Sequence, residues 1–428
     1  MSRRSIFSKE NTFWAFLGQV IDADGGCKEV VRKLQSYASV KGGRISSSTT
    51  ASYCTARKKL DQQSLTSIFQ HTAVLGDKST QTGLLYNRRV IVVDGTGLSM
   101  PDTHENQEAW PQSSLQKPVC GFPSARVCAC FSMESGSLLS YEIGNKKNHE
   151  LPLLRKQWKT FKAGDIFLGD KGFCSYYDTA KLKEKGVDSV ITLARRKPVG
   201  KSKCLKFLGP NDLLIKWDRP KYTPQLSYSR ETMAELPKEL TLRQIRVVVD
   251  NPGFRTKEFH IVTTLLDSVR YLSDEIASLY LKRWDVELFF RDIKITMGMD
   301  ILRCQTPELI RKELVMHFIA YNCIRRLMYE AAEKADLPVR KLSFKGILQA
   351  IRSWSPQINR EELSRVEMNK LLNDLHEALA DSPLKQRPGR SEPRCRKRRP
   401  KAYQLLTKPR HKMNQITHRD NYVAKALN

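Results

Sequence analysis

The 428-residue sequence contains no uninterrupted apolar run long enough to span a bilayer, which excludes an ordinary membrane-spanning protein. Its first residues also lack the apolar core of a secretory signal peptide. The ten cysteines include no Cys-x-x-Cys pair, a pattern that favours neither a zinc knuckle nor a disulfide framework. Together these absences predict a cytoplasmic protein with reduced thiols.

The sequence is also short of acidic side chains. It has 45 Asp and Glu residues against 73 Lys and Arg, a formal net charge of +28. An excess of this size favours a polyanionic partner, because basic side chains displace condensed counterions from phosphates. The excess is densest at residues 385–412, which hold Arg398 and Arg399 and a single acidic residue. Such a run is typical of a disordered arm that binds a phosphate backbone.

Residues 1–85 contain few strand signals and are expected to be helical. Ser and Thr at 46–50 supply N-cap candidates for a helix that carries Arg57 and Lys58. A short polar turn before such a helix is what a helix-turn-helix DNA reader needs, so Arg57 and Lys58 are candidate DNA contacts. Many helices that do not bind DNA begin in the same way, and this alternative stays open.

From Arg89 onwards the pattern changes to short β-branched strands, with helices interleaved later. This order implies a mixed sheet covered by helices. Strand candidates at 213–217, 242–249 and 258–265 indicate a β-rich insertion. The expected divisions are 1–85 (helical N-terminal domain), 86–195 (first part of the core), 196–270 (β-rich insertion), 271–345 (core helices) and 346–428 (C-terminal helical segment and basic tail).

Two aspartates stand where strands end. Asp94 and Asp170 each close an apolar run and precede a glycine-containing turn, so their side chains are expected to be rigidly held yet reachable. Taken singly, either one could instead be a turn or cap residue. Asp102 lies in a loop and Asp165 begins its strand, so we rank these two rival carboxylates lower.

A third carboxylate, Glu287, lies in a predicted helix. At about 100° per residue, one stripe of this helix spans an arc of roughly 80°. The stripe contains Tyr280, Arg283, Glu287, Arg291 and Lys294. A carboxylate framed by cations suits a stripe that faces an anion, although salt-bridged helix faces are also common. Asp94, Asp170 and Glu287 together would hold two divalent cations about 4 Å apart for phosphoryl transfer.

The spacing Tyr280-x-x-Arg283-x-x-x-Glu287-x-x-x-x-x-x-Lys294 matches the YREK signature of the DDE transposases of insertion-sequence family 4. The segments 94–96 and 170–173 resemble the two aspartate motifs of that family. The resemblance runs from about residue 40 to 412 and includes the stretch 101–123 and the basic tail.

The resemblance implies an RNase H-like mixed α/β core with Asp94 on the first strand, Asp170 on the fourth and Glu287 on a later helix. These three residues would be the catalytic ligands of Mg²⁺, with Mn²⁺ as a substitute. The resemblance implies that Tyr280, Arg283 and Lys294 contact DNA. The charge of the sequence adds further candidate DNA contacts, which are Arg291, Arg57, Lys58, Arg398 and Arg399. Trp217 is a candidate to hold a flipped base.

The implied partners are the inverted-repeat ends of an insertion sequence and a target DNA, bound by a homodimer associated with the nucleoid. The implied activity is cleavage at the ends and joining of the 3′ ends to the target. Two alternatives remain, a catalytically inactive DNA-binding copy and a structure-specific nuclease of the same fold. His149-Glu150 has no second histidine at metal-ligand spacing, so we interpret Glu150 as a solvated surface residue.

Overall fold

The computed structural model describes residues 6–40, 42, 45, 47–78, 85, 87–145, 149–193, 203–223, 228–249, 258–358, 363–381, 383–384 and 406–413. Arg398 and Arg399 lie outside these residues. None of the helices in the described ranges is both long enough and apolar enough to cross a membrane.

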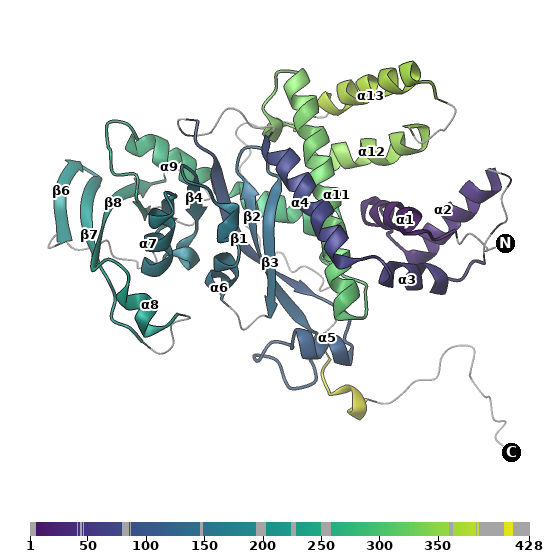
Figure 1. Cartoon of the computed structure of the whole chain (residues 1–428), viewed down its shortest axis with the longest axis horizontal. Coiled ribbons are helices and arrows are strands. Elements are labelled where there is room, and N and C mark those ends of the chain that lie inside the picture. The colour runs from purple at the N-terminus through teal and green to yellow at the C-terminus, as the bar shows by residue number, and fades with distance from the viewer. Residues whose placement is uncertain are drawn as a thin grey trace.

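The centre of the protein is a nine-stranded sheet with the order β3-β2-β1-β4-β5-β9-β8-β7-β6 (Figure 1). Its strands are β1 (Val90–Ser99), β2 (Ser124–Ser132), β3 (Leu138–Asn145), β4 (Ile166–Gly169), β5 (Asp188–Thr192), β6 (Cys204–Gly209), β7 (Asp212–Asp218), β8 (Glu239–Val248) and β9 (Glu258–Thr263). Strand β1 runs antiparallel to β2 and parallel to β4, and β4 runs parallel to β5. The order β3-β2-β1-β4-β5 with these directions is the RNase H-like arrangement, and this prediction is confirmed.

The strands expected as a β-rich insertion continue the same sheet. Strand β9 pairs antiparallel with β5, with Val262 opposite Ile191, and β8, β7 and β6 follow outwards. A buried ion pair fixes β7 against β8, because Arg243 Nε donates to Asp212 Oδ1 at 2.8 Å. The division of the chain into domains stays a prediction.

Helices cover both faces of the sheet. They are α1 (Lys9–Ile21), α2 (Cys27–Val40), α3 (Ala51–Lys58), α4 (Gln62–Lys78), α5 (His104–Ala109), α6 (Glu150–Arg155), α7 (Tyr176–Glu184), α8 (Arg230–Ala234), α9 (Ser273–Lys282), α10 (Asp285–Arg291), α11 (Pro307–Lys334), α12 (Phe344–Ile358) and α13 (Arg365–Ala380). Alternate residues of β1 point to opposite faces. Ile91 and Val93 pack with α6 and α7, whereas Val90 and Val92 pack with α4, α9, α10 and α11.

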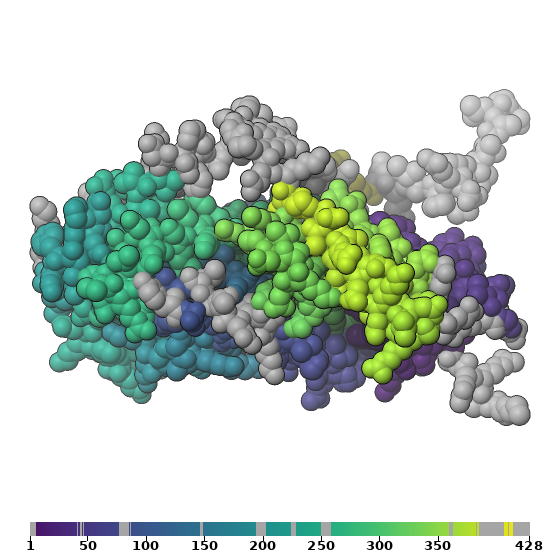
Figure 2. Space-filling view, turned by 90° about the horizontal axis from the view of Figure 1, so that it is seen from above, coloured from purple at the N-terminus to yellow at the C-terminus, as the bar shows by residue number. Residues whose placement is uncertain are grey.

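Helix α11 joins the N-terminal helices to the sheet. Thr306 caps its start and Pro307 occupies the first turn, a combination that favours helix initiation. Tyr321 donates to the Gly136 carbonyl at 2.7 Å, and Asn322 bonds the backbone of Leu138. Helices α1 and α4 pack along α11. Helices α1–α3 lie at one end of the long axis of the molecule, and strands β6–β8 lie at the other (Figure 1, Figure 2).

Candidate active site

Asp94 and Asp170 lie side by side on neighbouring strands. The parallel pairing of β1 with β4 ends immediately before both aspartates. Because side chains alternate between the faces of a strand, both carboxylates point to the face that α9, α10 and α11 cover. Asp94 accepts from the Gly95 N–H at 2.7 Å, and Asp170 accepts from the Gly172 N–H at 2.7 Å. Local backbone contacts therefore fix both carboxylates at one edge of the core.

Negative charge is concentrated at this pair. The pKa of Asp94 is raised to about 6, mainly because burial disfavours its charged form, with a contribution from the nearby carboxylates of Asp170 and Glu150. The Gly95 N–H and the Arg283 guanidinium act in the opposite direction. A divalent cation beside Asp94 and Asp170 would offset this negative charge, and their oxygens are the donors that Mg²⁺ prefers.

Tyr280 and Arg283 face the aspartates from the covering helices. Arg283 Nη1 lies 4.0 Å from Asp94 Oδ2, and its guanidinium lies over the Tyr280 ring at 5.6 Å. The Tyr280 hydroxyl hydrogen-bonds with the Thr192 hydroxyl at the end of β5. The pKa of Tyr280 is raised to about 12, mainly by burial and in smaller part by the charges of Asp170 and Asp94. Its phenol is therefore neutral at the aspartates.

Glu287 lies on α10, and its side chain is exposed. Arg283, one turn before Glu287, lies beside Asp94. Lys294, two turns after Glu287, donates to Thr96 Oγ1 at 3.0 Å and to the Gly97 carbonyl at 2.8 Å. Helix α10 therefore passes along the end of β1, with Glu287 between these two contacts. Among the described residues, however, no three Asp, Glu, His or Cys side chains are grouped closely enough to hold a metal ion. Glu287 as a third metal ligand stays a prediction.

A family model described as "Transposase DDE domain" matches residues 86–323, which contain Asp94, Asp170 and Glu287. The chain belongs to this family. It is 26% identical over 410 residues to Transposase InsG for insertion sequence element IS4 of Escherichia coli (strain K12), covering 95% of this chain and 89% of InsG. The predictions of a DNA transposase and of its resemblance to insertion-sequence family 4 are confirmed.

Among solved structures, this chain is similar to a chain in the cryo-EM structure of the piggyBac transposase synaptic complex with hairpin DNA. The two chains are 11% identical with a TM-score of 0.36, and the match covers 71% of this chain and 59% of that one.

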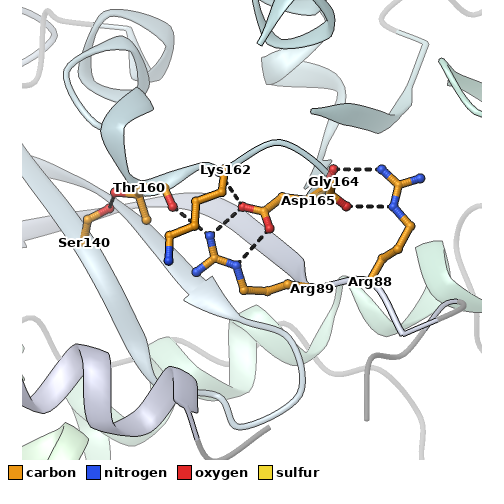
Figure 3. Close-up of polar contacts among 7 residues, drawn as sticks. All are labelled: Arg88, Arg89, Ser140, Thr160, Lys162, Gly164 and Asp165. Atoms are coloured by element: carbon orange, nitrogen blue, oxygen red, sulfur yellow. Dashed lines mark hydrogen bonds and ion pairs between the residues drawn. The ribbon is translucent and has the colours of Figure 1, made fainter. Parts of the chain in front are cut away.

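The rival aspartates of the transposase have structural contacts. Asp165 forms a buried ion pair with Arg89, whose Nε lies 3.0 Å from Oδ1, and it accepts from the Lys162 N–H at 2.7 Å (Figure 3). This cluster lies at the start of β4, at the opposite end of the strand from Asp170. Asp102 accepts from Gln107 Nε2 at 2.7 Å within the loop after β1.

Glu150 is the acidic residue that our sequence interpretation missed. It begins α6, and its carboxylate lies against the first glycine of each aspartate motif, Gly95 and Gly172. A Cβ atom on Gly95 would overlap with Oε1, so only glycine leaves the space that this carboxylate occupies. Burial raises the pKa of Glu150, Arg126 lowers it, and Asp170 raises it. Glu150 is half-buried, so its interpretation as a solvated surface residue is wrong, and the glycine after Asp94 was the available signal.

Arg57 does not reach the surface of α3. Its guanidinium lies over the rings of Phe16 at 5.0 Å and Tyr53 at 4.9 Å, and its Nη2 lies 3.4 Å from Cys27 Sγ. Only 6% of the residue is exposed. Arg57 therefore holds α1, α2 and α3 together, and the expectation that it contacts DNA is corrected. Lys58 is exposed on the same helix and stays a candidate.

The stripe on the catalytic helix is not continuous. A π-turn from Asp292 to Thr296 follows α10 and changes the direction in which later side chains point. Lys294 turns towards β1, whereas exposed Arg291 lies 3.6 Å from Asp292 Oδ1 and lines a groove together with Asp285 and Leu288. Burial raises the pKa of Asp292 to about 6. Glu287 and Arg291 are one turn apart within α10 and share a face, so the π-turn interrupts the stripe only between Arg291 and Lys294. Arg291 as a DNA contact stays a prediction.

Trp217 lies on β7 and packs edge-on against Tyr176 of α7, with ring centroids 5.4 Å apart. Its indole is part of the apolar cluster between the sheet and α7. A role in holding a flipped base stays a prediction.

Proposed function

We propose that this transposase cuts DNA at the inverted-repeat ends of its insertion sequence and joins the 3′ ends to target DNA by metal-dependent phosphoryl transfer. One observation carries the proposal. Asp94 and Asp170 leave adjacent parallel strands side by side, and Arg283 faces them from a covering helix. Acidic side chains for cations, with a guanidinium for a phosphate, are the groups that phosphoryl transfer requires.

Asp94, Asp170 and Glu287 would hold divalent cations, with Mg²⁺ the natural ion and Mn²⁺ a substitute. Bound there, such ions activate the attacking hydroxyl and stabilise the leaving oxygen. Glu287 has to come closer to the aspartates than in the free protein, because no three such side chains of the described residues are grouped closely enough there to hold a metal ion. The bound cations would supply the positive charge that draws it in.

Tyr280, Arg283 and Lys294 would orient the scissile strand. The Arg283 guanidinium can donate two hydrogen bonds to a phosphate, and the Lys294 ammonium adds a charge beside Thr96. Tyr280 remains protonated at neutral pH, because its pKa is about 12, and it can donate a hydrogen bond. These groups lie on the same side of the sheet as the aspartates.

Other parts of the chain would bind the rest of the DNA. Exposed Lys58 on α3 is proposed to contact the transposon end, and Arg398 and Arg399 to contact phosphates from the basic tail. The resemblance to insertion-sequence transposases supports a homodimer that acts in the nucleoid. Trp217 is retained as the candidate for a flipped base.

The test is an in vitro reaction with the full-length protein, Mg²⁺, a duplex that carries the element's own terminal repeats and a supercoiled target. Cleavage followed by strand-transfer products is the expected result. Cleavage without strand transfer would favour a nuclease, and binding without cleavage would favour an inactive regulatory copy. A chelator should stop the reaction, and Mg²⁺ or Mn²⁺ should restore it.

Arg283→Lys keeps the positive charge at the aspartates but removes the planar guanidinium. We expect end cleavage to fall about 10- to 100-fold, because an ammonium cannot make the bidentate phosphate contact. The matched control is Arg270→Lys, since the exposed Arg270 also lies over a tyrosine ring, Tyr271, at 5.3 Å but away from the aspartates. Initial cleavage rates of both variants decide the point. Equal rates would remove Arg283 from the phosphate-binding group.

Asp94→Asn should stabilise the folded protein above pH 6 when no divalent cation is present. The ordinary pKa of Asp is near 3.8 and the folded value is about 6, so the native state holds its proton more tightly. Native stability therefore falls as the pH rises from about 4 to 6, by about 2 to 3 kcal/mol, and is constant above. Asparagine avoids this cost.

Urea unfolding in chelator at pH 4 and pH 8 measures the difference. Asp94→Asn should be about as stable as the wild type at pH 4 and more stable at pH 8. Asp165→Asn provides the opposite control, because it weakens the buried ion pair with Arg89 and should destabilise the protein at pH 8. If Asp94→Asn is less stable than the wild type at pH 8, then burial and the neighbouring carboxylates do not destabilise the charged form of Asp94.

A further inference from the structure

The carboxylate of Glu150 lies behind both aspartate motifs. Gly95 follows Asp94 directly, and a Cβ atom there would overlap with Glu150 Oε1. A Cβ atom on Gly172, two residues after Asp170, would lie 3.6 Å from Glu150 Oε2. The glycine in each motif therefore faces the same carboxylate. At Gly172 a Cβ atom would first meet Asp170 Oδ1, at 2.9 Å, so only the space at Gly95 is required by Glu150.

Glu150 approaches the aspartates from the opposite face of the sheet. Gly95 continues the row of Ile91 and Val93, which packs under α6, whereas Asp94 points to the face of Arg283. The missing side chain at Gly95 leaves a gap in this row, and Glu150 occupies it. Its charge therefore acts through the edge of β1, from the face opposite to Arg283.

The start of α6 is held firmly. Leu153 and Leu154 are buried in the apolar cluster against β1 and β2. At the end of the helix, Arg155 makes two hydrogen bonds of 2.8 Å to Asp178 of α7. The guanidinium of Arg126 lies 3.8 Å from Glu150 Oε1, on the same face. Packing and charge together keep the carboxylate at the two glycines.

We propose that Glu150 is a positioning residue of the catalytic centre, which strengthens the binding of divalent cations at Asp94 and Asp170 through space. This inference rests on the proposed function. Glu150 adds a third negative charge beside the two aspartates and is only partly offset by Arg126. It contacts neither the scissile phosphate nor the attacking hydroxyl, since it lies behind β1.

The direct test is Mn²⁺ binding by the full-length protein, measured as the loss of the electron paramagnetic resonance signal of free Mn²⁺. Glu150→Gln should weaken binding about tenfold, the effect of one charge on a divalent ion about 6 Å away in a water-like medium. Glu142→Gln is the matched control. It also removes one carboxylate charge, but Glu142 lies on β3, which β2 separates from β1. Unchanged Mn²⁺ affinity in Glu150→Gln would overturn the inference.

Asp94→Asn separates this inference from the proposed function. If Asp94→Asn abolishes Mn²⁺ binding and Glu150→Gln does not weaken it, only the role of Glu150 fails. If neither variant weakens binding, the cation site itself is wrong and both proposals fail. In the reaction, the Glu150→Gln defect should lessen as the Mg²⁺ concentration rises, whereas a folding defect would not respond.

A double-mutant cycle tests the geometry without relying on activity. Gly95→Ala should lower the melting temperature of the wild type, because its Cβ atom overlaps with the Glu150 carboxylate. In a Glu150→Ala background the same change should have little effect, since the space is then free. An equal loss in both backgrounds would show that Gly95 serves another purpose and would overturn the steric part of the inference.

Discussion

Asp94→Asn and Asp170→Asn should each abolish end cleavage by the transposase while DNA binding persists. Asparagine keeps the size and the hydrogen bonds from Gly95 and Gly172, but it loses the charge that a divalent cation requires. We expect a loss of about a thousandfold or more, which exceeds the 10- to 100-fold effect of losing an outer-shell partner. The two effects should be equal, because the aspartates are proposed to act as a unit.

Cleavage of a labelled duplex with the element's ends measures this loss, and a gel-shift assay with the same duplex checks binding. Asp102→Asn is the control, since Asp102 lies in a loop and accepts a hydrogen bond from Gln107. It should cleave at close to the wild-type rate. Near-normal cleavage by either catalytic variant would eliminate the proposed centre.

The positions of the two aspartates could be predicted because their signals are local. Each follows a short apolar strand and precedes glycine, and a parallel pair of strands brings such ends together. The interleaved strands and helices indicated a mixed sheet covered by helices, whereas the RNase H-like order of β1 to β5 was implied only by the family resemblance. The continuation of the sheet through β9 could not be predicted, because its pairing with β5 depends on contacts about 70 residues apart.

The interpretations of Arg57 and Glu150 were wrong for a shared reason. Arg57 was assigned to DNA by its charge, but a guanidinium can also be buried over aromatic rings. Glu150 was set aside because no histidine stands at metal-ligand spacing from it, although its carboxylate occupies the space that Gly95 leaves free. In each case tertiary packing decides the role, and periodicity or charge alone does not show it.

Glu287→Gln should abolish cleavage as completely as Asp94→Asn, although Glu287 is exposed in the free protein. The contacts of Arg283 and Lys294 with β1 hold its helix beside this strand, and we propose that Glu287 reaches the aspartates when cations bind. Glu105→Gln on α5 is a control with an equally exposed carboxylate. Stability and DNA binding should be unchanged, because Glu287 is not part of the core.

A thiol at the same position distinguishes a metal ligand from a general electrostatic effect. Glu287→Cys should be inactive with Mg²⁺ and partly active with Mn²⁺, because a thiolate binds softer ions better than Mg²⁺. A variant that is equally defective with both ions would argue against direct ligation. If Glu287→Gln cleaves normally while Glu150→Gln does not, the third carboxylate of the centre is Glu150, and the helix that carries Glu287 serves only to bind DNA.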